Sequence, residues 1–149
     1  MNTNTTKKTN KKGFTLVELV VVIAILAILA AIAIPVVANT INSSTRSAAL
    51  SNAQTLELAL KEADAMIKAG DTSIYTNGTA TTVADVCTAK SIDLDDTVTV
   101  GSDTFTLTWS SADDKCYYMN GTNSLDGSTP TTSNEDITSD STQTVAGLF

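Results

Sequence analysis

Hydrophobic residues are concentrated in one uninterrupted run near the start of this chain. Leu19 to Ala38 comprises 20 residues without a charge. At about 1.5 Å per residue, a helix of that length crosses a bilayer core of roughly 30 Å. Pro35 lies inside the run, where it removes one helical hydrogen bond and crowds the carbonyl four residues back. We therefore expect a membrane-capable helix with a kink or local unwinding around 31–35.

The apolar pattern then changes to a stripe along one face of a helix. After the polar tract 39–44, apolar residues recur at intervals of three or four, namely Ala49, Ala53, Leu56, Leu60, Ala63 and Ile67. Two oppositely charged pairs lie off this stripe at i,i+4 spacing, Glu57–Lys61 and Asp64–Lys68. Gly70 is a suitable C-terminal cap. The two patterns together predict one helix from Phe14 to Ala69, about 84 Å long, whose first half needs lipid or other subunits around it.

The pattern after Gly70 predicts a small β-rich head. We expect a short helix or turn at Val83–Lys90, a hairpin over 98–110 that turns at Gly101-Ser102, and a third strand at 115–119. In the second hairpin strand, threonines alternate with Phe105, Leu107 and Trp109, which predicts one wet and one apolar face. The Ser/Thr-rich segment 121–143 predicts surface loop with at most a short edge strand, and 145–149 is expected to dock on the sheet. The predicted fold class is α+β, a long N-terminal helix packed against a small antiparallel sheet.

Glu18 is the feature of the N-terminal region that a simple anchor does not explain. A carboxylate at the start of an apolar helix disfavours membrane insertion. Three ordinary alternatives exist for this region: a secretory signal peptide with a cleavage site near Ala31-Ile32-Ala33, a signal anchor, and a buried core helix. Glu18 argues against the first two. The length of the run and its basic flank argue against the third.

Glu18 belongs to a longer motif, Gly13-Phe14-Thr15-Leu16-Val17-Glu18, which follows the basic pair Lys11-Lys12. This motif resembles the class III signal of type IV prepilins and pseudopilins. The resemblance implies that a prepilin peptidase cleaves after Gly13 and that Phe14 becomes the N-methylated N-terminus. It also implies assembly roles for Glu18, which is fifth in the mature chain, and for Pro35, which is twenty-second.

The same resemblance implies a division of the chain and a set of partners. The parts are a cleaved leader (1–13), an apolar membrane and filament-core helix (14–38), an amphipathic helix half (39–70) and a head (71–149). The implied assembly is a helical homo-oligomeric filament built with an assembly ATPase and its platform protein. The precursor is expected in the cytoplasmic membrane with its head outside, and the assembled subunit in a cell-surface pilus.

The charge distribution fits that orientation. The chain has 149 residues and a net charge of −7. Four of its nine basic residues are lysines of the leader, so the remainder carries five basic against 16 acidic residues, a net charge of −11. Basic residues just before an apolar helix keep that end cytoplasmic. An acidic surface does not attract nucleic acid, so no nucleic-acid binding is inferred.

Few residues are candidates for chemistry. The chain has no histidine, and no cofactor is expected. Cys87 and Cys116 would meet an oxidising environment after export, so we expect a disulfide between them; two unrelated buried thiols are the alternative. Calcium is considered only for an aspartate set without EF-hand spacing, Asp93, Asp95, Asp96, Asp113 and Asp114.

These observations favour a structural subunit over an enzyme. The expected function is that of a major pilin in a type IV pilus for adhesion, twitching motility, biofilm formation or DNA uptake. The alternative within the family is a pseudopilin of a type II secretion or competence system. The alternative outside the family is a monomeric, membrane-anchored extracellular binding module, for which Glu18→Ala would be neutral.

Overall fold

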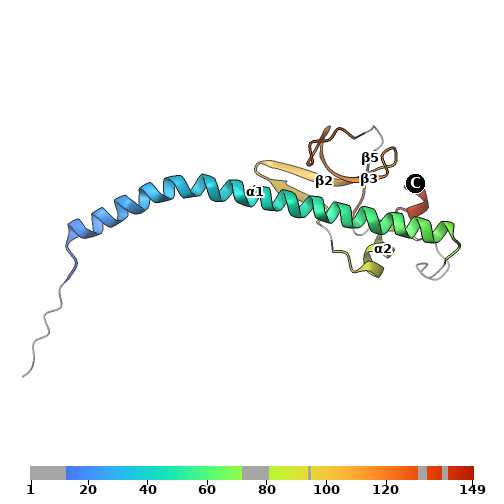
Figure 1. Cartoon of the computed structure of the whole chain (residues 1–149), viewed down its shortest axis with the longest axis horizontal. Helices are drawn as coiled ribbons and strands as arrows, with labels where there is room; N and C mark the ends of the chain where they lie inside the picture. Colours follow the sequence, from blue (N-terminus) through green and yellow to red (C-terminus); the bar gives the residue numbers. More distant parts are fainter. Residues whose placement is uncertain (1–12, 72–80, 94, 131–133, 139–140) are drawn as a thin grey trace, which may run out of the picture. The chain divides into compact units, whose positions relative to one another are not determined.

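The computed structural model describes residues 13–71, 81–93, 95–130, 134–138 and 141–149. The chain divides into two units, Met1–Asn39 and Thr40–Phe149. One helix, α1, continues from the first unit into the second, and all the described strands belong to the second unit (Figure 1). The predicted α+β class, with a long N-terminal helix and a small antiparallel sheet, is confirmed.

Helix α1 spans Leu16–Lys68, 53 residues. It begins two residues later than predicted, because Thr15 caps it. Of the kink or local unwinding expected around Pro35, the unwinding is not found, since the helix is continuous there; a proline removes only one hydrogen bond of the ladder. The kink stays a prediction. Gly70 ends the helix as predicted, with a left-handed φ of 79°. Its N–H bonds to the carbonyl of Ile67, and the N–H of Asp71 bonds to that of Met66, the pattern of a Schellman cap.

In the unit Met1–Asn39, the apolar side chains of α1 are exposed. Its large apolar side chains from Leu16 to Val37 are between 49% and 78% exposed. By length and composition, this helix can cross a membrane. On a soluble monomer, a contiguous exposed apolar surface of this kind would indicate a site that binds a protein or a membrane.

In the unit Thr40–Phe149, the second half of α1 is one wall of the core. The predicted stripe is confirmed, with Ala49, Ala53, Leu56, Leu60 and Ala63 buried and Ile67 partly buried. Both predicted ion pairs are present, at 2.8 Å for Lys61–Glu57 and 2.7 Å for Lys68–Asp64. Asp64, placed off the stripe by the pattern, is nevertheless 91% buried, since its relative exposure is 9%.

The sheet is antiparallel and follows the strand order β1-β2-β3-β4. Its strands are β1 (Thr97–Val100), β2 (Asp103–Ser110), β3 (Lys115–Asn120), β4 (Asn123–Ser124) and β5 (Asn134–Asp136). The predicted hairpin is confirmed, with Val100 opposite Asp103 across the turn at Gly101-Ser102. β5 pairs with the end of β2, on the edge opposite β3. The loop prediction for 121–143 is therefore interrupted by two short strands.

Helix α2 (Val83–Lys90) confirms the short helix predicted there. Thr82 and Asp85 form a reciprocal capping box at its start. Lys90 on α2 pairs with Glu62 on α1 at 2.7 Å. The turn η1 (Val145–Gly147) and its neighbours dock on the sheet as expected, since the indole Nε1–H of Trp109 donates to the Leu148 carbonyl at 2.9 Å.

Two predictions about the head were wrong. Thr108 of β2, predicted on the wet face, is buried, because β3 and β5 flank this end of the strand and its hydroxyl donates to the Tyr117 carbonyl. Ser110 at the end of the strand is also buried, and its hydroxyl donates to Asp113. The disulfide is not formed either. The thiols of Cys87 and Cys116 are buried, are not bonded to each other and pack in the apolar core between α1, α2 and the sheet.

Some predictions fall outside the described residues. They concern the leader up to Lys12 and the part of the head at 72–80. The division of the chain into four parts stays a prediction.

Candidate processing and assembly site

The residues of the implied cleavage site lie outside the helix. Gly13, Phe14 and Thr15 have no regular secondary structure and are exposed. Phe14 is 92% exposed, and a Cβ built on Gly13 would meet no atom within 4 Å. The backbone on both sides of the Gly13–Phe14 bond is therefore open, as a peptidase substrate requires.

Thr15 and Glu18 form a capping box at the start of α1. The backbone N–H and the hydroxyl of Thr15 both donate to Glu18 Oε2, each at 2.9 Å. In return, the backbone N–H of Glu18 donates to Thr15 Oγ1 at 3.2 Å. This reciprocal pair satisfies donors that a helix N-terminus otherwise leaves without a partner. Glu18 is thus bonded within its own chain, although it precedes a run of purely apolar residues.

The same residues border an open hollow. Gly13, Phe14, Thr15 and Glu18 line a space of about 330 Å³. A cut after Gly13 would place a new amino group on Phe14, at the wall of this hollow. The structure therefore brings together three of the predicted site residues, Gly13, Phe14 and Glu18. It does not bring Pro35 to them, because Pro35 lies 17 positions after Glu18 in the helix (35 − 18), about 25 Å along the axis.

Thr15 is the site residue that the sequence reasoning missed. The signal that identifies it is the spacing Thr15-x-x-Glu18 directly before an apolar run, which predicts a capping box. The same spacing recurs in Thr82-x-x-Asp85, where a box also forms.

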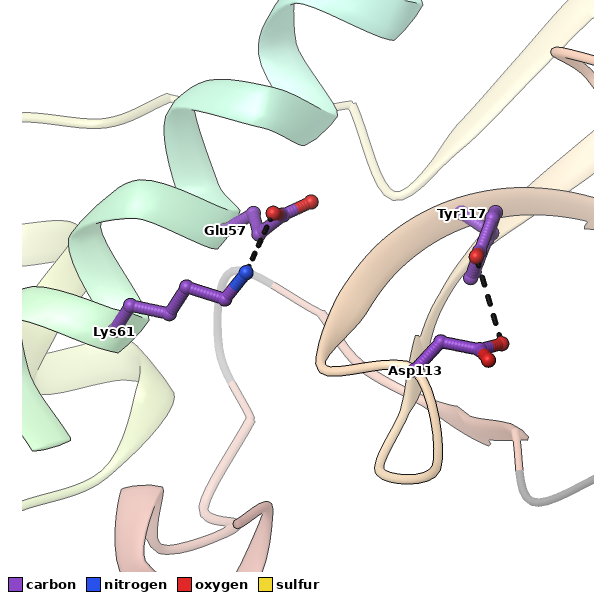
Figure 2. Close-up of polar contacts among 4 residues, drawn as sticks. All are labelled: Glu57, Lys61, Asp113 and Tyr117. Carbon is purple, nitrogen blue, oxygen red and sulfur yellow. Dashed lines mark hydrogen bonds and ion pairs between the residues drawn. The ribbon is translucent and has the colours of Figure 1, made fainter. Parts of the chain in front are cut away.

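A second hollow lies in the head, between the second half of α1 and β3. It measures about 390 Å³ and is lined by Leu50, Ala53, Gln54, Glu57, Leu58, Lys115, Cys116, Tyr117 and Asp126. Figure 2 shows two of its lining side chains bonded to residues outside the lining, with Lys61 reaching Glu57 and the Tyr117 hydroxyl directed at Asp113. Burial, with Asp113 nearby, raises the pKa of Tyr117. Burial also raises the pKa of Cys116, so its thiol stays neutral.

The part of the chain that the structure describes contains no assembled metal site. There, no three side chains of His, Cys, Asp or Glu gather to hold an ion. The aspartates considered for calcium, at 93–96 and 113–114, do not form such a group.

Comparison with known proteins bears on the N-terminal site alone. Residues 8–34 match the family model of the prokaryotic N-terminal methylation motif. No curated protein and no solved structure matched the chain. The match spans the cleavage site, the capping box and most of the apolar run, and it supports a type IV pilin-like or pseudopilin protein, a class of structural subunits. The chain therefore carries the class III, N-terminal methylation signal of type IV pilins and pseudopilins.

Proposed function

We propose that the chain is the structural subunit of a type IV pilus, in which copies polymerise through the first half of α1. The observation that carries this proposal is the methylation motif at 8–34 leading into an uncovered apolar helix. Such a surface is stable only when lipid or protein covers it. Lipid covers it in the precursor, and neighbouring helices cover it in the filament.

Glu18 favours the move of the helix from lipid into the filament. In lipid its carboxylate is disfavoured. Next to the positive amino group of a processed Phe14, the carboxylate gains an ion-pair partner, and in an apolar filament core each charge is costly without the other. The pair then sets the axial register of packed helices, as buried polar groups do in coiled coils. Pro35 removes one rung of the hydrogen-bond ladder, so that the stem bends more easily while it packs.

The proposal includes the partners of this pathway. A prepilin peptidase removes residues 1–13 and methylates Phe14, and an assembly ATPase acts through a platform protein. The lysines before the apolar run keep the leader in the cytoplasm, so that the head lies outside. The assembled subunit is proposed to lie in a cell-surface pilus that serves adhesion, motility, biofilm formation or DNA uptake.

A pseudopilin of a secretion or competence system is the second candidate, because the matched motif belongs equally to that class. The abundance of filaments separates the two. Long filaments made mainly of this chain favour the pilus, whereas short filaments seen only on overexpression favour the pseudopilin.

Replacing Gly13 tests the proposal at its first step. Space around Gly13 is open, so Gly13→Leu leaves the fold intact and acts on the peptidase alone. We expect a full-length, membrane-bound precursor and no filaments on immunoblot and electron microscopy. Gly121→Leu is not a suitable control, because Gly121 has a φ of 60°, which a leucine adopts only with strain. Leu58→Ala, which replaces an exposed side chain, is the control instead and is expected to be processed normally. Normal processing of Gly13→Leu would contradict the proposal.

A further inference from the structure

The turn of the β1–β2 hairpin contacts α1 close to the first residues of the unit Thr40–Phe149. The side-chain oxygen Oδ1 of Asn42 accepts a hydrogen bond from the backbone N–H of Gly101 at 3.2 Å, across 59 positions of the chain. We infer that this bond is a latch, and that residues 40–48 of α1 form a hinge that unwinds locally when the latch opens. The inference concerns the head and does not depend on the proposed function.

Residues 40–48 have little apolar packing of their own. None of them is buried, and only Asn42 and Thr45 are half-buried. The buried residues of α1 begin at Ala49. Segments that bury few apolar side chains open locally at a low free energy. Opening of this stretch therefore leaves the core that starts at Ala49 intact.

A hollow lies between this stretch and the sheet side of the head. It measures about 270 Å³ and is lined by residues of α1 between 44 and 52 and, opposite them, by Asp95, Val98 and Tyr118. Atoms that line such a space lack van der Waals partners across it. The opposite wall is held in place, because the Tyr118 hydroxyl donates to the Asp95 carbonyl at 2.5 Å. The helix is the side of the hollow with the weaker support.

The amino-acid composition of the stretch adds to this weakness. Residues 40–45 consist of threonine, isoleucine, asparagine and serine, all of which form helix less readily than alanine or leucine. Asparagine and serine side chains also compete for backbone hydrogen bonds. The stretch is nevertheless helical throughout. A bond from outside the helix is therefore expected to matter more here than in the part rich in alanine and leucine that follows.

The donor of the latch belongs to a well-defined turn. Gly101 has a φ of 67°, a conformation that suits glycine in a tight hairpin turn. Val100 pairs with Asp103 around it, so the Gly101 N–H lies in the turn, outside these ladder pairs. A Cβ built on Gly101 would be 3.7 Å from Asn42 Nδ2, which places the turn and the asparagine in close contact. Figure 1 shows the hairpin lying along α1. The latch therefore joins the weak stretch of the helix to a fixed part of the sheet.

The test is hydrogen–deuterium exchange, measured by mass spectrometry on the full-length chain in detergent micelles. Asn42→Val removes the acceptor, and valine has about the same helix propensity as asparagine, so the change acts through the bond. Asn42→Asp retains an acceptor oxygen. Asn52→Val is the matched control, because Asn52 is also half-buried and lines the same hollow.

We expect Asn42→Val to accelerate amide exchange in residues 42–48 about fivefold, the ratio for the loss of one hydrogen bond. Exchange in residues 56–63 should stay at the wild-type rate. Asn42→Asp and Asn52→Val should both leave residues 42–48 at that rate.

Three results would each overturn the inference. They are wild-type exchange of residues 42–48 in Asn42→Val, an equal acceleration in Asn42→Asp or Asn52→Val, and an acceleration in Asn42→Val that extends equally to residues 56–63. The last result would show that the bond stabilises the whole head rather than a local hinge.

Discussion

Replacing Glu18 by alanine removes a carboxylate whose described bonds lie within the helix start. The first loss is the capping box with Thr15, worth about 1 kcal/mol of helix stability. The second, in the filament, is the ion pair, because removing one partner of a buried pair costs about 3–5 kcal/mol. Only the second loss acts on assembly, because the capping box lies within one chain and is lost from free and assembled subunits alike; about 3–5 kcal/mol per subunit contact corresponds to roughly a hundredfold or more in the association constant.

The same change has little effect on the precursor. Membrane insertion loses a disfavoured carboxylate, so the anchor holds at least as well. The head stays folded, because its core on α1 begins at Ala49, 31 residues further along the chain (49 − 18). A strain that makes only Glu18→Ala is therefore expected to contain a normal amount of membrane-bound subunit and no filaments.

Electron microscopy and immunoblotting of that strain provide the assay. Glu62→Ala is the matched control, since it removes a carboxylate whose pair with Lys90 is largely exposed and contributes about 1 kcal/mol at most. It should leave filaments unchanged. Wild-type numbers of normal filaments in the Glu18→Ala strain would refute the reasoning.

Two further predictions concern the head. Leu60→Ala, at a fully buried position, should lower the free energy of unfolding by about 2–5 kcal/mol in denaturant titration. Leu58→Ala, at a side chain that is 68% exposed, should leave that free energy nearly unchanged. Equal effects of the two substitutions would contradict the packing of α1 against the sheet. Burial, with Asp95 and Asp96 nearby, raises the pKa of Tyr118 to about 12, so the unfolded chain releases this proton first and stability should fall between about pH 10 and 12. Tyr118→Phe should flatten that fall, and an unchanged slope would contradict it.

Much of the fold could be predicted because periodicity records burial directly. The stripe from Ala49 to Ile67 predicts which face of the helix meets the core, and the structure agrees. In β2 the alternation correctly predicts that Leu107 and Trp109 are core residues, although it does not predict the burial of Thr108. The overlooked start of α1 at Leu16 was also in the sequence, in the spacing of Thr15 and Glu18. The helix continues through Pro35 because the remaining bonds of the ladder suffice, which no local rule states.

Other features depend on contacts between distant segments and leave no local pattern. Ser110 is buried because β5 returns to the edge of β2 and because Asp113 accepts its hydroxyl. Cys87 and Cys116 were expected to bond because of their implied compartment, yet they pack as separate thiols in the core. Spacing along the chain does not determine whether two thiols meet in bonding geometry.

The N-terminus of the mature protein tests the central claim most directly. Mass spectrometry of the subunit purified from membranes or from sheared filaments identifies its first residue and any modification of its amino group. We expect a chain that lacks residues 1–13 and begins with N-methylated Phe14. A mature chain that retains the leader, or that begins after Ala33, would contradict it.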